Sequence, residues 1–249
     1  MILEADLGNS RIKWRLREAE TLLAKGVAEG LNSFLAEASA QVRSQERPLR
    51  RFFCVSVRSS QTNDELREKS CEHWGLNPEF AQSQAFCAGV ENGYQSPESL
   101  GADRWMAVVA AFSRLNRACV VVDAGSAITV DLISYRGRHL GGYIGPGLNM
   151  MRRSLNTTAG IHLAGETGGW DCAPGRATQT AVASAIGAMI SGLIDEATRQ
   201  LEVSEGLAPE LVLTGGDASW LKTRYPAAHH WPDLVLDGLA LAMADYRTN

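Results

Sequence analysis

The chain has 249 residues, of which 45% are hydrophobic and 21% are charged. This length and composition are enough to bury one large core or two smaller ones. A net charge of −4 and a pI of about 5.8 argue against a nucleic-acid-binding protein, which more often carries a basic patch. The cysteines are scattered without C-x-x-C spacing and the histidines without metal-ligand spacing, so we expect neither a disulfide scaffold nor a zinc site.

We expect a cytoplasmic protein that makes no contact with a membrane. The first residues include an acid, Glu4, where a secretory signal peptide would be basic. No uninterrupted apolar run approaches the roughly 20 residues that a transmembrane helix requires.

The predicted elements begin with a hairpin. Residues 2–6 predict a strand, and residues 11–16, which alternate with a period of two, predict a second strand. Between them a tight turn is expected, since Gly8 and Asn9 tolerate positive φ angles. The further expected elements are, in order, a strand over 52–57, a helix over 64–74, a helix over 105–115 capped by Asp103, strands over 119–123, 128–133 and 140–144, a helix over 179–201, strands over 211–214 and 234–236, and a helix over 238–242.

The segment around Asp123 repeats the pattern of the first hairpin. Asp6 and Asp123 are 117 positions apart, as are Gly8 and Gly125, and both segments read strand–Asp–x–Gly–small–x–strand. A repeat of this length indicates two similar domains rather than a solenoid, whose period is about 20–50 residues. We expect an N-terminal domain over residues 1–116 and a C-terminal domain over residues 117–249.

Three strand–turn units have the composition of phosphate-binding loops. They are Asp6-Leu7-Gly8-Asn9-Ser10 with Lys13, Asp123-Ala124-Gly125-Ser126 with Thr129, and Thr214-Gly215-Gly216-Asp217. Turns rich in small residues point backbone N–H groups inward, and Lys13 can neutralise phosphate charge. Neither a P-loop nor a dinucleotide-binding glycine motif is present. One such unit alone is an ordinary turn, but two hairpin loops facing each other across a cleft would hold the two ends of a triphosphate.

Acidic side chains near these turns suggest phosphoryl transfer. Asp6 and Asp123 are candidate ligands for Mg²⁺, which takes one or two carboxylates together with nucleotide phosphates and water. Asp103 is the candidate base that orients the attacking hydroxyl group. Its alternative interpretation is a plain helix cap, and the two are compatible, because a capped and ionised carboxylate still accepts a proton.

Five motifs follow one another along the chain. They are Asp6-x-Gly8-Asn9-Ser10-x-x-Lys13, Gly101-Ala102-Asp103-Arg104-Trp105, Val122-Asp123-Ala124-Gly125-Ser126-Ala127-Ile128-Thr129, Gly141-Gly142-Tyr143-Ile144-Gly145-Pro146-Gly147 and Thr214-Gly215-Gly216-Asp217. In this order they resemble the type III pantothenate kinases over nearly the whole chain. The Gly-Ala-Asp-Arg segment is the most diagnostic, because other actin-like kinases lack it.

The resemblance implies an α/β fold of two tandem ribonuclease-H-like domains of the actin-like superfamily, with mixed sheets flanked by helices. It implies ATP-dependent phosphorylation of pantothenate to 4'-phosphopantothenate, the first step of coenzyme A biosynthesis. ATP with Mg²⁺ and a monovalent cation, K⁺ or NH₄⁺, are the implied cofactors, and a homodimer is the implied assembly.

The resemblance also implies roles for particular residues. ATP would bind at Asp6, Leu7, Gly8, Asn9, Ser10, Arg11, Ile12, Lys13 and Ser126. Pantothenate would bind at Tyr94, Gly101, Ala102, Asp103, Arg104 and Thr178. Asp103 would accept the proton, and Arg104 would pair with the substrate carboxylate. Asp123 would bind the monovalent cation, and Asp6 would bind Mg²⁺ through ATP.

The chain departs from the family pattern at two positions. Ser126 stands where members often have Thr, which keeps the hydroxyl group, and Ala177 precedes Thr178 where many members have Asn.

Two other functions remain open. A non-catalytic regulator of the Bvg accessory factor type would share the fold, but it need not keep Asp6, Lys13, Asp103 and Arg104. Another actin-like phosphotransferase, acting on a sugar or acetate, would not be expected to carry the Gly-Ala-Asp-Arg segment. The small residues of the helix over 179–201 fit either packing inside one subunit or contact between subunits.

Overall fold

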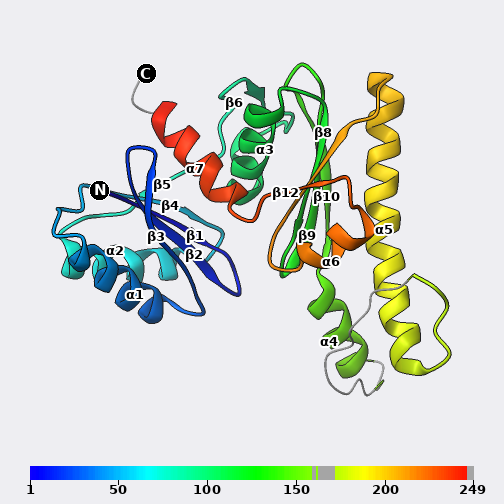
Figure 1. Ribbon diagram of the computed structural model, residues 1–249, viewed down its shortest axis with the longest axis horizontal. Coiled ribbons are helices and arrows are strands. Elements are labelled where there is room, and N and C mark those ends of the chain that lie inside the picture. Colours follow the sequence, from blue (N-terminus) through cyan, green and yellow to red (C-terminus); the bar gives the residue numbers. More distant parts are fainter. Residues whose placement is uncertain (159–160, 162–171, 246–249) are drawn as a thin grey trace. The chain divides into compact units, whose positions relative to one another are not determined.

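The computed structural model describes residues 1–158, 161 and 172–245 (Figure 1). The chain divides into two compact units, one of Met1–Ser113 with the C-terminal segment from Asp233, the other of Arg114–Pro232. The sequence division into 1–116 and 117–249 had left the C-terminal segment in the second domain. Helix α7 (Leu234–Asp245) corrects that assignment, because it packs on strands of the first unit.

The sheet of the first unit has the strand order β3-β2-β1-β4-β5. Its strands are β1 (Ile2–Leu7), β2 (Ile12–Glu18), β3 (Thr21–Ala28), β4 (Arg51–Ser56) and β5 (Glu79–Phe80), and its first two helices are α1 (Leu31–Ser44) and α2 (Ser60–Trp74). Strand β1 pairs antiparallel with β2 and parallel with β4. The expected hairpin is therefore confirmed, and it supplies the central strand of the sheet.

Alternation along β1 and β2 sorts their side chains between the two faces of the sheet. Leu3, Leu7, Ile12 and Leu16 are fully buried in one core with Phe34 of α1. Each such side chain contributes about 1.5–3 kcal/mol through burial. The opposite face carries the charged residues of the same strands, so the hairpin presents its polar side chains away from this core.

The rest of the first unit comprises β6 (Phe86–Cys87), β7 (Val90–Glu91), a 3-10 helix (Pro97–Ser99), α3 (Ala102–Leu115) and α7. Helix α3 is the expected helix, but it starts at Ala102, so Asp103 lies in its first turn and does not precede it. Every residue from Arg104 to Phe112 is buried. Helix α3 is thus a core helix whose amino-terminal turn carries the Gly-Ala-Asp-Arg motif.

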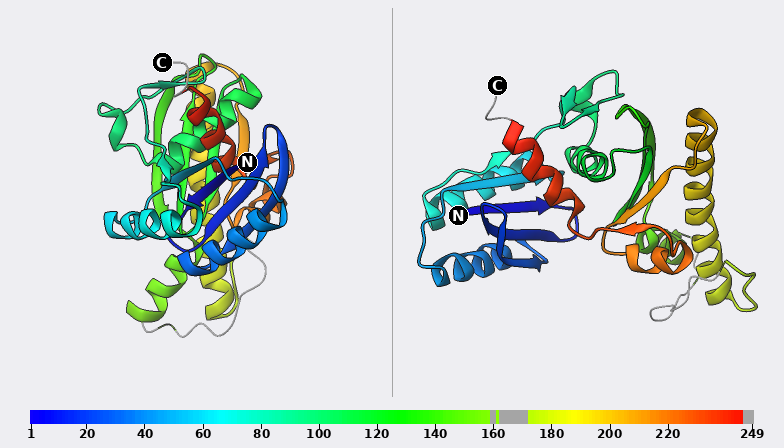
Figure 2. Two further views of the ribbon diagram at one scale, coloured as in Figure 1. Left: turned by 90° about the vertical axis from the view of Figure 1, so that its left-hand side faces the viewer. Right: turned by 45° about the horizontal axis from the view of Figure 1, so that its top comes forward.

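The sheet of the second unit has the order β10-β9-β8-β11-β12. Its strands are β8 (Cys119–Ala124), β9 (Ala127–Ile133), β10 (His139–Pro146), β11 (Glu210–Thr214) and β12 (His229–His230), and its helices are α4 (Leu148–Thr158), α5 (Thr178–Glu205) and α6 (Ala218–Arg224). Helix α5 runs along one face of this sheet (Figure 2) and contacts β8 and β9. Its buried residues, among them Ile186, Ile190 and Ile194, complete the core of the second unit.

The two sheets share one topology. In each, a central strand pairs antiparallel with the strand that follows it and parallel with a strand that comes later. The expected fold class, mixed sheets flanked by helices, is confirmed, and Asp6 and Asp123 both lie near the carboxyl ends of the central strands.

One element was predicted with the wrong type. Residues 234–236 were expected to form a strand, but they form the first turn of α7, where the amide N of Asp237 donates to the carbonyl O of Asp233 at 3.0 Å. Leu234, Val235 and Leu236 are all buried. A short buried aliphatic run is compatible with a core helix as well as with a strand. Tertiary packing therefore determines which of the two secondary structures these residues form.

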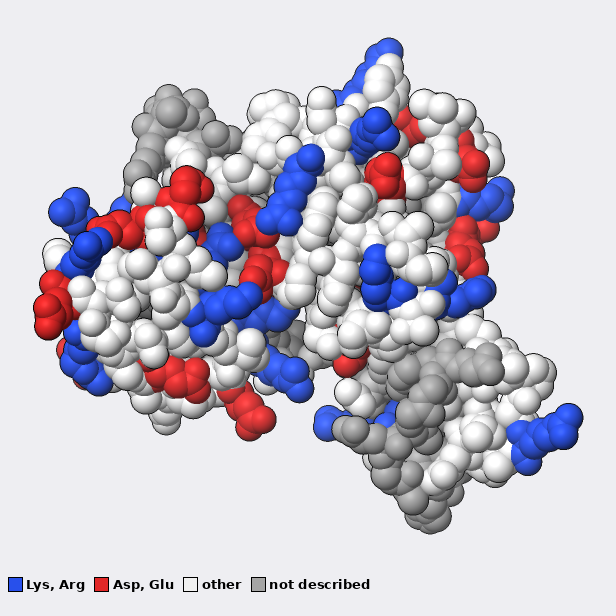
Figure 3. Space-filling model, in the orientation of Figure 1, with Lys and Arg blue, Asp and Glu red and all other residues white. Residues whose placement is uncertain are grey.

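Within the described part of the chain, one helix, α5, is long and apolar enough to cross a membrane by length and composition alone. Its row of core residues shows why a helix of a folded domain meets the same criteria. On the face drawn in Figure 3, acidic and basic side chains are interspersed.

Candidate active site

The turn between β1 and β2 is exposed and anchored by its backbone. Strand register places Asp6 opposite Lys13 at the mouth of the turn. The residues between them that reach solvent are Asn9, Ser10 and Arg11. The carbonyl O of Gly8 accepts a hydrogen bond from Nε of Arg58 at 2.8 Å. The turn thus offers a cation, a hydroxyl group and an amide at one exposed position, which suits an anionic ligand.

The Gly-Ala-Asp-Arg motif folds around the start of α3. The carbonyl O of Gly101 accepts from the amide N of Trp105 at 2.9 Å, and Oδ1 of Asp103 accepts from the amide N of Arg104 at 2.8 Å. A Cβ atom at Gly101 would lie 2.9 Å from Oδ1 of Asp103 and 3.8 Å from Cδ of Arg104. A larger residue at position 101 would therefore push the carboxylate of Asp103 out of its place.

Arg104 connects this helix to the loop that carries Tyr94. Its Nη1 donates to Oη of Tyr94 at 2.9 Å, and its guanidinium carbon lies 5.7 Å from the centre of the Tyr94 ring. Arg104 is only 6% exposed. A nearly buried guanidinium needs acceptors for its N–H groups, and Tyr94 supplies one of them.

Asn92 holds the Tyr94 loop in place, and sequence analysis did not single it out. Its Oδ1 accepts from the amide N of Tyr94 at 3.0 Å, and its Nδ2 donates to the carbonyl oxygens of Gln84 at 3.1 Å and Pro97 at 3.2 Å. Asn92 is 8% exposed. The spacing Asn-x-Tyr is a signal for an asparagine that bonds its own backbone two residues on, and it could have identified this role.

In the second unit three loops converge on the end of β8. Strand register places Asp123 beside Thr129 of β9 and Thr214 of β11. Gly215, with φ of +93°, would place a Cβ atom 2.4 Å from Oδ1 of Asp123. The amide N of Gly147 donates to the carbonyl O of Ser126 at 3.1 Å. A Cβ atom at Gly147 would lie 2.3 Å from the carbonyl O of Gly125, so this close approach needs glycine at both positions.

Thr214 adds an unexpected feature to this cluster. It is 1% exposed, and its Oγ1 makes no hydrogen bond within the described part of the chain. Buried hydroxyl groups usually have a hydrogen-bond partner, either a protein group or an ordered water molecule. The neighbouring carboxylate of Asp123 makes an oxygen-rich site here, although no group of three or more His, Cys, Asp and Glu side chains among the described residues could hold a metal ion.

Thr178 is the first residue of α5 and is exposed. The start of the helix is completed by Thr180, whose Oγ1 accepts from the amide N of Ala177 at 3.1 Å. The hydroxyl group of Thr178 is therefore not needed for capping.

Comparison with known proteins identifies the family. The family model described as type III pantothenate kinase matches residues 2–200. The chain belongs to the type III pantothenate kinase family. A type III pantothenate kinase of Cellvibrio japonicus is 37% identical over 245 residues, covering 96% of this chain and 95% of that protein. One of Pseudomonas aeruginosa is 40% identical over 249 residues, covering 97% and 98%.

Solved structures support the fold. A protein described as a Baf family transcriptional activator from Campylobacter jejuni aligns with a TM-score of 0.62 at 25% identity, covering 99% of this chain and 100% of that chain. A protein described as a 2-dehydro-3-deoxygalactonokinase from Sinorhizobium meliloti aligns with a TM-score of 0.61 at 12% identity, covering 99% of each chain. The second likeness shows the shared fold alone.

In this member of the type III pantothenate kinase family, the predicted site residues form groups within each unit. In the first unit the β1–β2 turn is one group, and Tyr94 with Gly101–Arg104 is another. In the second unit Asp123 and Ser126 share the β8–β9 turn, and Thr178 lies at the start of α5.

Proposed function

We propose that the chain transfers the γ-phosphoryl group of ATP to the primary hydroxyl of pantothenate, forming 4'-phosphopantothenate and ADP, the first step of coenzyme A biosynthesis. Membership of the type III pantothenate kinase family supports this reaction. The single structural observation that carries it is the arrangement of Asp103, Arg104 and Tyr94 at the start of α3.

Asp103 is the proposed proton acceptor. Phosphoryl transfer proceeds mainly by positioning and charge stabilisation, with a carboxylate that orients the attacking hydroxyl and takes its proton. The hydrogen bond from the amide N of Arg104 fixes Oδ1 of Asp103, so the other carboxylate oxygen is directed toward the substrate in our proposal. The hydroxyl oxygen bonds to the γ-phosphorus, the bond to the β-phosphate oxygen breaks, and Asp103 receives the proton.

Arg104 and Tyr94 are the proposed partners of the pantothenate carboxylate. Because Arg104 donates to Oη of Tyr94, the phenolic proton must point away from the guanidinium group. A substrate carboxylate can then accept from both side chains, and charge-assisted hydrogen bonds of this kind are about twice as strong as neutral ones.

The β1–β2 turn is the proposed site for the ATP phosphates. Asn9, Ser10 and Lys13 would bind phosphate oxygens, and Ser126 of the second unit would contact ATP. Mg²⁺, which kinases of this kind use with ATP, neutralises charge on the β- and γ-phosphates when bound. Asp6, opposite Lys13 in the hairpin, is the residue of this turn that would face the metal.

Asp123 is the proposed ligand of a monovalent cation, K⁺ or NH₄⁺. The buried hydroxyl of Thr214 beside it supports this role, because protein oxygen atoms replace the hydration shell of a bound K⁺ and this hydroxyl can supply one of them beside the carboxylate. Thr178 is proposed to contact pantothenate.

A homodimer that acts in the cytoplasm completes the proposal. Helix α5 exposes apolar residues at helical spacing on its outer face, namely Ala181, Ala185, Ala188 and Met189. Small side chains let two helices approach closely, which supports a subunit contact along α5.

A regulatory function is the second candidate, and one observation favours it. The Campylobacter jejuni structure aligned above carries the description of a Baf family transcriptional activator. A regulator would have no need of a positioned carboxylate, whereas the kinase requires Asp103.

Steady-state measurement of pantothenate-dependent ADP release tests the proposal. Asp103→Asn is expected to lower kcat by about 10²–10⁴-fold. Lys13→Ala is expected to raise KM for ATP. Arg104→Lys is expected to raise KM for pantothenate, because lysine lacks the planar guanidinium group that can bind a carboxylate through two hydrogen bonds. Asp64→Asn, an exposed residue of α2, is the control. A wild-type protein without turnover in either K⁺ or NH₄⁺ would support the regulator instead.

A further inference from the structure

Helix α7 contacts two parts of the first unit that carry proposed site residues. It packs on β1, the strand that leads into the β1–β2 turn, and its close contact with Met106 of α3 involves Gly238. These contacts occur at adjacent positions of the helix, Asp237 and Gly238, and they come from a segment that sequence analysis had placed in the other domain.

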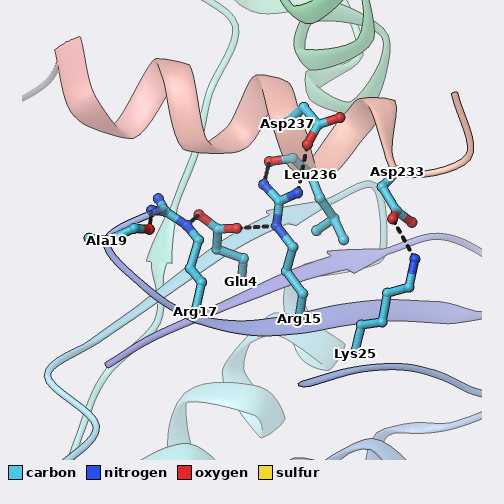
Figure 4. A network of polar contacts seen from close by, with 8 residues as sticks. All are labelled: Glu4, Arg15, Arg17, Ala19, Lys25, Asp233, Leu236 and Asp237. Carbon is cyan, nitrogen blue, oxygen red and sulfur yellow. Dashed lines mark hydrogen bonds and ion pairs between the residues drawn. The ribbon is translucent and has the colours of Figure 1, made fainter. Parts of the chain in front are cut away.

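The contact with the hairpin is made by Arg15 (Figure 4). Its Nε donates to Oε2 of Glu4 at 2.5 Å, its Nη1 donates to Oδ1 of Asp237 at 2.6 Å, and its Nη2 donates to the carbonyl O of Leu236 at 2.8 Å. Burial lowers the pKa of Arg15, but the carboxylates of Glu4 and Asp237 outweigh it and raise that pKa above its ordinary value. The guanidinium group is therefore a permanent charge that joins β1, β2 and α7.

Glu4 makes this junction rigid. It is fully buried, and its second carboxylate oxygen accepts from Nε of Arg17 at 2.7 Å. A buried carboxylate with both oxygens bound by guanidinium groups has few alternative positions, because each move leaves a buried charge unpaired.

The junction lies close to the proposed phosphate site. Lys13 is two residues before Arg15 on the same strand and face, about 6.5–7 Å away along β2. Asp6 is two residues after Glu4 on β1 and is the register partner of Lys13. A shift of Arg15 would therefore move the pair at the mouth of the turn.

The contact with α3 is made by backbone atoms. A Cβ atom at Gly238 would lie 1.9 Å from the carbonyl O of Met106 and 2.7 Å from its Cα. Met106 is fully buried and lies three residues after Asp103, one turn further along α3. Only glycine permits this approach, so the position of α7 sets the position of the helix that carries Asp103.

We propose that α7 fixes the spacing between the β1–β2 turn and Asp103, and that Asp237 and Gly238 are positioning residues for phosphoryl transfer. The inference rests on the proposed roles of that turn and of Asp103. Asp237 acts through Arg15 on the strand that ends at the turn, and Gly238 acts through Met106 on the helix that holds the carboxylate. A displacement of about 1 Å at reacting groups can lower the rate about 10²-fold. A smaller displacement at the contact of Asp237 or of Gly238 should therefore produce a measurable decrease in kcat.

A second ion pair, made by the residue that directly precedes α7, provides a matched control. Nζ of Lys25 on β3 lies 2.9 Å from Oδ2 of Asp233, and these side chains are 56% and 34% exposed, compared with 13% and 20% for Arg15 and Asp237. Exposed pairs contribute little, and this one joins the residue before α7 to β3, not to the strands of the turn. Asp233→Ala should therefore leave kcat unchanged.

The test compares kcat and both KM values of the full-length protein, well below the melting temperature of each variant. Asp237→Ala is expected to lower kcat about tenfold, while each KM changes less than threefold. The contacts with each substrate persist in this variant, but the turn and Asp103 no longer keep their relative positions. Asp237→Asn retains an acceptor oxygen for Arg15 and should recover most of that loss. Gly238→Ala should lower kcat at least as much as Asp237→Ala.

The outcomes separate this inference from the proposed function. Asp103→Asn is measured in the same series. If it loses activity while folded Asp237→Ala keeps wild-type kcat, the positioning role is wrong and the site assignment stands. If Asp103→Asn retains activity, the assignment itself is wrong. Should Gly238→Ala fail to fold, the Asp237→Ala and Asp237→Asn pair decides alone, and equal kcat values for these two variants would also overturn the inference.

Discussion

Replacing Gly101 by alanine isolates the position of the proposed base from the fold around it. The added Cβ atom would lie 2.9 Å from Oδ1 of Asp103, closer than the roughly 3.5 Å of an ordinary van der Waals contact. The carboxylate must then move by about half an ångström and weaken its 2.8 Å hydrogen bond from Arg104. Since about 1 Å of misplacement costs about 10²-fold, we expect kcat to fall roughly tenfold.

A matched alanine variant at Gly30 separates the effect of Gly101→Ala on stability from its effect on kcat. Gly101 and Gly30 each precede a helix and accept its first backbone hydrogen bond, but a Cβ atom at Gly30 meets nothing within 4 Å. Both substitutions should cost about 0.5–1 kcal/mol of stability as the helix start loses glycine.

ADP release and thermal unfolding are measured for both alanine variants. We expect similar melting temperatures for the two variants and a loss of kcat for Gly101→Ala alone. Equal kcat values for the two variants would refute it.

Three further predictions concern other parts of the two units. Asn92→Asp replaces a hydrogen-bond donor by an acceptor and releases the Tyr94 loop. KM for pantothenate should therefore rise about tenfold or more, which corresponds to over 1.4 kcal/mol of binding free energy, while KM for ATP stays unchanged. Parallel changes in both KM values would contradict this role of Asn92. Gly215→Ala displaces the carboxylate of Asp123, so a K⁺ titration of activity should lose its response, and an unchanged midpoint would argue against a cation there. Burial, and to a smaller extent a nearby carboxylate, raises the pKa of the Cys119 thiol from 9.0 to about 12. Because the thiol of the unfolded chain ionises first, the free energy of unfolding measured in urea should fall from pH 9 toward pH 12 at up to about 1.4 kcal/mol per pH unit. The same slope in Cys119→Ala would show that Cys119 is not the cause.

Local sequence patterns were sufficient for the β1–β2 and β8–β9 hairpins and their turns. The β1–β2 hairpin follows from alternation and from a Gly-Asn turn, both of which act over a few residues. The same pattern around Asp123 correctly indicated a second sheet of the same topology. The start of α3 was misplaced by a few residues, because helix ends depend on individual capping contacts.

The role of α7 could not be read from local patterns. The contact of Arg15 with Asp237 joins residues 222 positions apart, and the buried run at Leu234 fits a strand or a helix equally well. Nothing within the segment indicates which domain it covers. The same limit applies to Thr214, whose unusual burial follows from the pairing of β11 with β8.

The Asn92 contacts lie between these cases. They are short in sequence, from Gln84 to Pro97, yet they connect both ends of a segment that contains the short strands β6 and β7. An asparagine before a tyrosine suggests a local turn, but the two carbonyl acceptors become visible only once the loop has folded.

The most direct test of the account is a comparison of wild type with Asp103→Asn, with products detected by ³¹P NMR and substrate binding by calorimetry. We expect wild type to form 4'-phosphopantothenate from pantothenate and Mg-ATP. We expect Asp103→Asn to bind both substrates with affinities within a few-fold of wild type and to turn over about 10²–10⁴-fold more slowly. Wild-type turnover by Asp103→Asn would contradict the assignment of the base on which the account depends.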